Sequence, residues 1–296
     1  ILVTLAAAVF QTGRFMLQKH LATDTLSAGG ATFSRFLYSA PFIALLLPLY
    51  LGLSGQGVPA LGPGFWLYGL MGGTAQIMAT VCVVLLFKQR NFAVGITFKK
   101  TEVIQTVLMG WIVLGEGVSG AGFAAIALGV VGLLLLSGGA EAKGLRLADL
   151  RNRAAGLGIA SGFLFAISAV CYRGASLAVV SDDPLLRAGV TLAAVVLMQT
   201  LIMAVWLRLR EPGQMRRVWA ARRVAVWIGL TSMGGSLCWF IAFTLQNAAY
   251  VKALGQVELM LSIAASTLFF RERISRREWA GMAVLALSIL ALVLAT

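Results

Sequence analysis

Long apolar runs separated by short polar segments dominate the sequence. A helix that crosses a bilayer needs about 20 mostly apolar residues, and ten stretches of the chain meet that length. Backbone groups in hydrocarbon must be hydrogen-bonded within their own segment, so each stretch predicts a helix and the chain an all-α integral membrane protein. The expected spans are 1–18, 28–51, 65–87, 92–114, 119–137, 155–177, 184–207, 224–245, 249–270 and 278–295.

The composition agrees with a membrane protein. Hydrophobic residues make up 59% of the chain and charged residues only 12%, against about 25% charged residues in soluble domains. The net charge of +13 invites an interpretation as a nucleic-acid binder. However, most Lys and Arg residues lie in short clusters between apolar runs, as expected at membrane–water boundaries. The expected macromolecular surroundings are therefore membrane lipid and not nucleic acid.

The two halves of the sequence resemble each other. Glu102 and Glu258 are separated by 156 positions, and so are Glu116 and Glu272. Five spans in each half is an odd number, so the second copy must enter the membrane in the opposite direction, which is the inverted repeat of many secondary transporters. We expect one membrane domain made of a five-helix repeat over 1–137, a basic connecting loop over 138–154 and a second five-helix repeat over 155–296.

The loop charges predict an orientation. Seventeen Lys and Arg residues fall in the odd-numbered loops and none in the even-numbered loops: Lys19, Lys88, Arg90, Lys143, Arg146, Arg151, Arg153, Arg208, Arg210, Arg216, Arg217, Arg222, Arg223, Arg271, Arg273, Arg276 and Arg277. Cytoplasmic loops carry the excess of such residues. We therefore expect the odd-numbered loops in the cytoplasm and both termini outside.

Two segments carry a family resemblance. Leu114-Gly115-Glu116, followed by Gly122 and Gly129, and Phe270-Arg271-Glu272-Arg273, followed by Trp279-Ala280-Gly281, resemble the repeat-ending signature of the EamA family in the drug/metabolite transporter superfamily. The resemblance implies a ten-helix carrier for amino acids, other small metabolites or drugs, with a central cavity lined by both repeats. We expect a multi-pass protein of a bacterial inner membrane, either a monomer or a homodimer. Members of the family usually have cytoplasmic termini, which is the reverse of the orientation that the charges predict.

A few polar side chains lie within the expected spans, where charge is expensive and usually faces a cavity or a partner. Lys99, Glu102 and Thr106 follow i, i+3, i+7 spacing and share one helix face. Trp239, deep in the eighth span, is a further cavity candidate. The candidate substrate- or ion-binding residues are Arg14, Arg35, Lys99, Lys100, Glu102, Thr106, Trp239, Gln256, Glu258 and Ser262.

These residues allow more than one interpretation. In one interpretation the two glutamates meet in a wet cavity, where they bind a cation, a substrate ammonium or a proton. Alternatively, Glu102 forms a buried ion pair with Lys99 or Arg35 that holds helices together. The guanidinium of Arg14 or Arg35 suits a substrate carboxylate, and equally a glutamate of the protein. Lys252, near the start of the ninth span, is expected to anchor that helix at the membrane boundary.

The absent motifs narrow the function. The sequence has no G-x-x-x-x-G-K-[ST] loop for ATP, no metal-ligand spacing and a single histidine, so we expect neither an enzyme nor a cofactor. The primary hypothesis is a secondary carrier that exports or exchanges a small polar metabolite such as an amino acid by alternating access, with glutamate protonation as its coupling to protons. The alternatives are a multidrug or organic-cation exporter and a membrane scaffold that transports nothing.

Overall fold

The computed structural model describes residues 1–24, 26–87, 98–137, 153–261 and 275–295, and confirms the all-α prediction for them. Six helices in these ranges are long and apolar enough to cross a membrane, and two shorter apolar helices accompany them. The helices of the described ranges are α1 (Leu2–Asp24), α2 (Ala28–Ser54), α3 (Phe65–Phe87), α5 (Glu102–Leu114), α6 (Gly120–Ser137), α7 (Arg153–Leu177), α8 (Pro184–Arg210), α9 (Gln214–Ala220), α10 (Arg222–Leu245), α11 (Ala248–Leu254) and α13 (Arg276–Ala295).

Capping residues in the sequence set several helix ends. The Ser27 hydroxyl accepts a hydrogen bond from the backbone N–H of Gly30 and starts α2. Asp183 does the same for the N–H of Leu185 at the start of α8, where Pro184 supplies a backbone already suited to the first turn. Gly115 ends α5 with a positive φ of 67°, a conformation that glycine adopts without steric cost.

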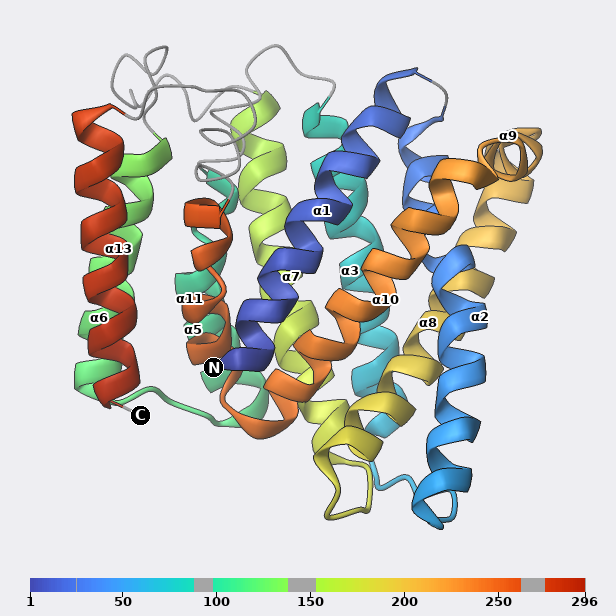
Figure 1. Ribbon diagram of the computed structural model, residues 1–296, viewed down its shortest axis with the longest axis horizontal. Coiled ribbons are helices and arrows are strands. Elements are labelled where there is room, and N and C mark those ends of the chain that lie inside the picture. Colours follow the sequence, from blue (N-terminus) through green and yellow to red (C-terminus); the bar gives the residue numbers. More distant parts are fainter. Residues whose placement is uncertain (25, 88–97, 138–152, 262–274, 296) are drawn as a thin grey trace.

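The helices run up and down between two faces of the molecule (Figure 1). The segments 55–64, 115–119 and 178–183 lie at the lower face of that view, while α9 lies at the upper face. From its N-terminus at the lower end α1 rises to the upper face, whereas α7 descends from the upper face to the lower one. Helices α1 and α7 therefore run in opposite directions.

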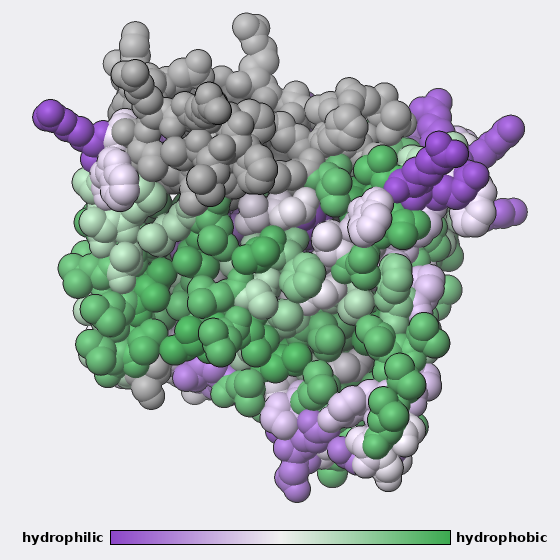
Figure 2. Space-filling model, in the orientation of Figure 1, coloured by the Kyte–Doolittle hydropathy of each residue, from purple (hydrophilic) through white to green (hydrophobic). Residues whose placement is uncertain are grey.

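On the face that Figure 2 shows, a broad apolar band covers the helices, and the most hydrophilic exposed residues lie above and below it. Leu45, Leu49, Trp111, Leu201 and Leu290 are all exposed, with more than half of each side chain's reference surface accessible. An apolar surface of this extent is stable only against another apolar medium, here the lipid tails. Six exposed arginines cluster around α9 at the upper face: Arg208, Arg210, Arg216, Arg217, Arg222 and Arg223.

Small residues allow the helices to approach closely. The most extensive contacts are those of α3 with α7, of α6 with α13 and of α1 with α10. Gly72 in α3 lies directly against the Tyr172 ring of α7, and Gly132 in α6 lies against the backbone of Leu285 in α13. Interfaces of this kind are typical of membrane helices, because lipid provides no hydrophobic drive for association and close van der Waals packing takes its place.

Candidate functional site

Two helix breaks position the charged residues. The fourth predicted span, 92–114, is not one unbroken helix: the chain turns at Lys100–Thr101 before α5 begins at Glu102. The ninth predicted span, 249–270, is also broken, because α11 ends at Leu254 and a turn at Gly255–Gln256 precedes a new helical segment at 257–261. Both expectations of continuous helices were wrong. The breaks fall at matching places in the two halves, immediately before the two glutamates.

Glu102 lies in a buried cluster with two lysines. One carboxylate oxygen, Oε1, is 2.6 Å from the Nζ atom of Lys252, and Oε2 is 3.3 Å from the Nζ atom of Lys99. The glutamate is 4% exposed, so water screens these ion pairs little. The carboxylate also occupies the first turn of α5, where the positive end of the helix dipole stabilises it. Of the two ion pairs considered for Glu102, the structure shows the one with Lys99. Arg35 bonds hydroxyl groups instead.

Lys252 is a component of this cluster and not a boundary anchor, which corrects the expectation from the sequence. Its ammonium lies 5.0 Å from the ring centroid of Trp239, 5.7 Å from that of Phe165 and 5.8 Å from that of Phe243. Aromatic faces attract a cation at such distances. Three rings and the Glu102 carboxylate thus hold a single ammonium group.

Glu258 connects to the same cluster through Gln11. The side-chain amide of Gln11 donates a hydrogen bond to Glu258 Oε2 at 2.6 Å, and its carbonyl oxygen accepts one from the indole N–H of Trp239 at 3.1 Å. Trp239 in turn contacts Lys252, which pairs with Glu102. One continuous network from α1, α10, α11 and α5 therefore joins the two glutamates.

A central cavity lies beside this network. About 380 Å³ of non-atom space lies in it, part of which is open to solvent, and its lining comes from α1, α2, α3, α7, α10 and α11. The polar and charged lining residues are Gln11, Arg14, Arg35, Gln76, Ser168, Tyr172, Ser236, Trp239 and Lys252. Neither glutamate lines it, because Gln11 and Lys252 stand between the carboxylates and the cavity. The expected wet cavity bordered by both carboxylates is thus replaced by one that borders their partners.

Arg35 and a glutamine cluster form the far wall of the cavity. The Arg35 guanidinium donates to the hydroxyls of Ser232 at 2.7 Å, Thr80 at 3.2 Å and Ser236 at 3.5 Å. Nearby, the Gln76 side-chain carbonyl accepts from the Tyr172 hydroxyl and from the Gln199 amide, each at 3.0 Å. Most of these polar groups thus find hydrogen-bond partners in the interior, as buried polar groups generally do.

The remaining candidates lie at different depths. Arg14 and Trp239 line the cavity, while Lys100 is buried but does not. Thr106 is also buried, and its hydroxyl donates to the Glu102 carbonyl of its own helix. Gln256 bonds the Lys252 carbonyl, and its side-chain oxygen has no hydrogen-bond partner within the described ranges. Ser262 lies outside the described residues.

An arginine–glutamate ion pair lies at the lower face. Arg173 at the end of α7 donates from Nε toward both carboxylate oxygens of Glu116, at 2.8 and 2.7 Å. Its Nη1 atom also donates to the backbone carbonyls of Phe243 at 2.7 Å and Gln246 at 2.9 Å. One side chain therefore ties α7 to the loop after α5 and to the end of α10.

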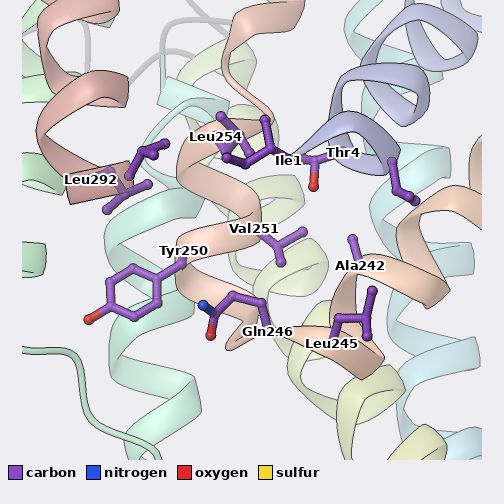
Figure 3. Close-up of a pocket in the computed structure, with 11 residues that line it drawn as sticks. Ile1, Thr4, Ala242, Leu245, Gln246, Tyr250, Val251, Leu254 and Leu292 are labelled. Carbon is purple, nitrogen blue, oxygen red and sulfur yellow. The ribbon is translucent and has the colours of Figure 1, made fainter. Parts of the chain in front are cut away.

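A larger, mainly apolar pocket lies between the lower parts of α1, α10, α11 and α13 (Figure 3). About 620 Å³ of non-atom space lies in it, part of which is open to solvent, and residues from all four helices line it, among them Thr4, Leu245, Val251 and Leu292. Val251 of α11 faces this pocket, whereas its neighbour Lys252 lines the central cavity. The apolar pocket and the charged cavity therefore lie on different sides of α11.

Comparisons with known proteins agree with this architecture. The family described as the EamA-like transporter family matches residues 152–294. One solved structure, described only as "Crystal structure of protein", superposes with a TM-score of 0.72 at 17% identity and covers 99% of this chain and 96% of its own. At that identity the likeness shows the fold alone. No curated protein matches the chain.

Proposed function

We propose, from the match of residues 152–294 to the EamA-like transporter family, that the whole chain is a secondary active carrier of a small polar metabolite such as an amino acid. The family is one of transporters and not of enzymes, and the long apolar helices make the chain a multi-pass membrane protein. The inverted repeat, the substrate-binding site, the proton coupling and the membrane orientation are our proposals, and they rest on the contacts described above.

The proposed architecture is two inverted five-helix repeats, over 1–137 and 155–296, that move against each other in alternating access. The packing supports it. Contact of α1 with α10 joins the first predicted span to the eighth, and contact of α3 with α7 joins the third to the sixth. The first span corresponds to the sixth and the third to the eighth, so exchanging the two repeats converts one of these contacts into the other. Helices α6 and α13, the fifth and tenth predicted spans, pack on each other.

The observation that carries the proposal is the charged network at the two helix breaks. Transporters place substrate and ion sites where discontinuous helices of two repeats meet. Here both breaks precede a glutamate, and the two glutamates are joined through Gln11, Trp239 and Lys252 beside a central cavity. A static scaffold has no use for so many buried charges, because each of them is expensive to insert into a membrane.

We assign proton coupling to Glu258. Glu102 lies between two lysine ammonium groups, whereas Glu258 accepts a hydrogen bond from the side-chain amide of Gln11, which lines the cavity. Glu258 is half-buried, and in this proposal its carboxylate carries the proton that moves with the substrate. Gln11 and Trp239 then relay the change in protonation to the cavity.

The upper face of Figure 1 is the proposed cytoplasmic side. The six exposed arginines around α9 lie there, as the positive-inside rule requires of cytoplasmic loops. At the lower face Arg173 is paired with Glu116, and Arg187 donates to the backbone carbonyls of Ser176 and Leu177 at the end of α7. Both of those arginines are thus used in helix-end bonding.

The aromatic rings around Lys252 support a second candidate, an exporter of organic cations or drugs. Trp239, Phe165 and Phe243 already surround one ammonium, and an organic cation would use the same rings if it displaced the lysine. Uptake of a lipophilic cation by everted membrane vesicles, absent for small metabolites, would favour that candidate over the metabolite carrier.

The test of the carrier proposal is transport by the purified protein in proteoliposomes. With an imposed pH gradient, Glu258→Gln should lower gradient-driven accumulation of a transported solute at least ten-fold, because the amide cannot carry the proton. Exchange of the solute without net proton movement should persist. Asp182→Asn, which neutralises an exposed carboxylate in the loop before α8, is the matched control and should leave both activities unchanged. Equal accumulation by the wild type and Glu258→Gln would refute the coupling.

A further inference from the structure

All charged side chains that line the central cavity are cations. They are Arg14, Arg35 and Lys252, and no described lining residue is acidic. The Lys252 ammonium is compensated by Glu102 at 2.6 Å. A cavity with such a wall has a positive potential, which in a low-dielectric interior attracts anions and repels cations.

Arg35 has donors to spare. A guanidinium carries five N–H groups, and three of the Arg35 nitrogens donate to the hydroxyls of Ser232, Thr80 and Ser236. In the described part of the chain no carboxylate pairs with it, although it is only 4% exposed. Two N–H groups therefore remain, in a side chain whose planar fork matches a carboxylate.

The surrounding network cannot neutralise this charge. Around the cavity the described residues supply five formal cations, namely Arg14, Arg35, Lys99, Lys100 and Lys252, and two carboxylates, Glu102 and Glu258. This leaves an excess of three positive charges. Glu102 is shared by two lysines, and Glu258 accepts from Gln11. A buried charge without compensation is strongly unfavourable, so the cavity is suited to a ligand that brings negative charge.

The other lining groups suit the remainder of such a ligand. The acceptor oxygens of Gln76 and Gln11 are already bonded, to Tyr172 and Gln199 in one case and to Trp239 in the other. A substrate ammonium would therefore find few free acceptors. The rings of Trp239 and Phe240 provide apolar faces for a short carbon skeleton.

We propose that the cavity binds a small organic anion whose carboxylate engages Arg35, with Arg14 and Lys252 completing a cationic wall. This inference rests on the carrier proposal and narrows it: the substrate class is organic acids and acidic amino acids of net negative charge. The positive potential repels organic cations, and a neutral zwitterion brings no net negative charge to compensate the cationic wall.

The test uses binding by the purified, detergent-solubilised full chain, which does not depend on transport. Thermal stabilisation and titration calorimetry with the sodium salts of succinate, lactate and glutamate are compared with alanine and choline chloride at equal ionic strength. The anions should stabilise the protein and the last two compounds should not. Arg35→Gln should weaken anion binding at least ten-fold and Arg35→Lys less, whereas the matched control Arg222→Gln, at an exposed arginine of α10, should bind like the wild type.

Several outcomes overturn the proposal. They are binding of alanine or choline in preference to every anion, no stabilisation by any anion of the series, or equal weakening by Arg35→Gln and Arg222→Gln. If Arg35→Gln fails to fold, Arg35→Lys and the comparison of ligands on the unmodified protein still decide. Anion binding that depends on Arg35 without any flux in proteoliposomes supports this site and refutes the carrier. Flux of alanine with no anion binding refutes the site and leaves the carrier standing.

Discussion

Neutralising Glu102 should destabilise the protein more than neutralising any carboxylate nearer the surface. Glu102→Gln keeps the side chain's shape but leaves two lysine ammonium groups, 2.6 and 3.3 Å from the carboxylate oxygens, without a counter-charge. At an effective dielectric constant of about 20, the two pairs contribute about 6 and about 5 kcal/mol of gross attraction. Desolvation offsets much of this, and removal of one partner from a buried pair costs about 3–5 kcal/mol.

The assay is equilibrium unfolding in mixed detergent micelles. We expect Glu102→Gln to lower the free energy of unfolding by about 3–5 kcal/mol. Glu116→Gln, whose side chain is 25% exposed, should lower it by only about 1 kcal/mol. The double variant Glu102→Gln/Lys252→Gln should be more stable than the sum of its single changes requires, by about 0.5–3 kcal/mol, because it removes both charges of one pair.

Two results would refute this reasoning. A loss below about 1 kcal/mol for Glu102→Gln would mean that water or lipid headgroups replace the carboxylate at little cost. Strict additivity in the double variant would mean that Lys252 and Glu102 do not interact energetically, whatever their distance.

Two further predictions concern helix packing and acid stability. Gly132→Ala places a methyl group 2.8 Å from the backbone nitrogen of Leu285, so it should lower the free energy of unfolding by about 1–3 kcal/mol. The control Gly13→Ala, with nothing within 4 Å of the added methyl group, should be neutral or stabilising in the same measurement. Equal effects of the two substitutions would contradict the close contact of α6 with α13. A hydrogen bond from the Tyr50 hydroxyl, with a smaller contribution from a backbone N–H, lowers the pKa of Asp183 below its ordinary value. A lowered folded-state pKa contributes stability that is present above the unfolded pKa of about 4 and is lost as the pH falls through the folded value. The wild type should therefore be more stable than Asp183→Asn at neutral pH, and the two unfolding free energies should converge below about pH 4; a constant difference across that range would contradict the assignment.

The sequence predicted most helices well because hydropathy alone determines them. The expected span 65–87 matches α3, and 119–137 matches α6 within one residue. Length and apolar content cannot reveal an internal turn, however. The breaks at Lys100–Thr101 and Gly255–Gln256 lie within otherwise suitable stretches, so both were read as continuous helices.

The candidate site was partly predictable. Buried charge in a membrane segment is rare enough to identify Glu102, Lys99 and Arg35 from the sequence alone. Contacts between helices are not encoded in any one helix's pattern, so the hydroxyl partners of Arg35 could not be foreseen. Lys252 was misplaced for a related reason. Only the short helix α11, ended by the turn at Gly255, brings its ammonium to Glu102.

The Arg173 side chain has a consequence for which substitutions this fold can tolerate. It bonds both oxygens of the Glu116 carboxylate and two backbone carbonyls of α10 and its end, so three segments far apart in the chain share one planar group. Lysine would retain the charge but offers a single nitrogen, which cannot reach all of these oxygens together. Separating α7 from the loop after α5 therefore also releases the end of α10, so these three segments are mechanically coupled.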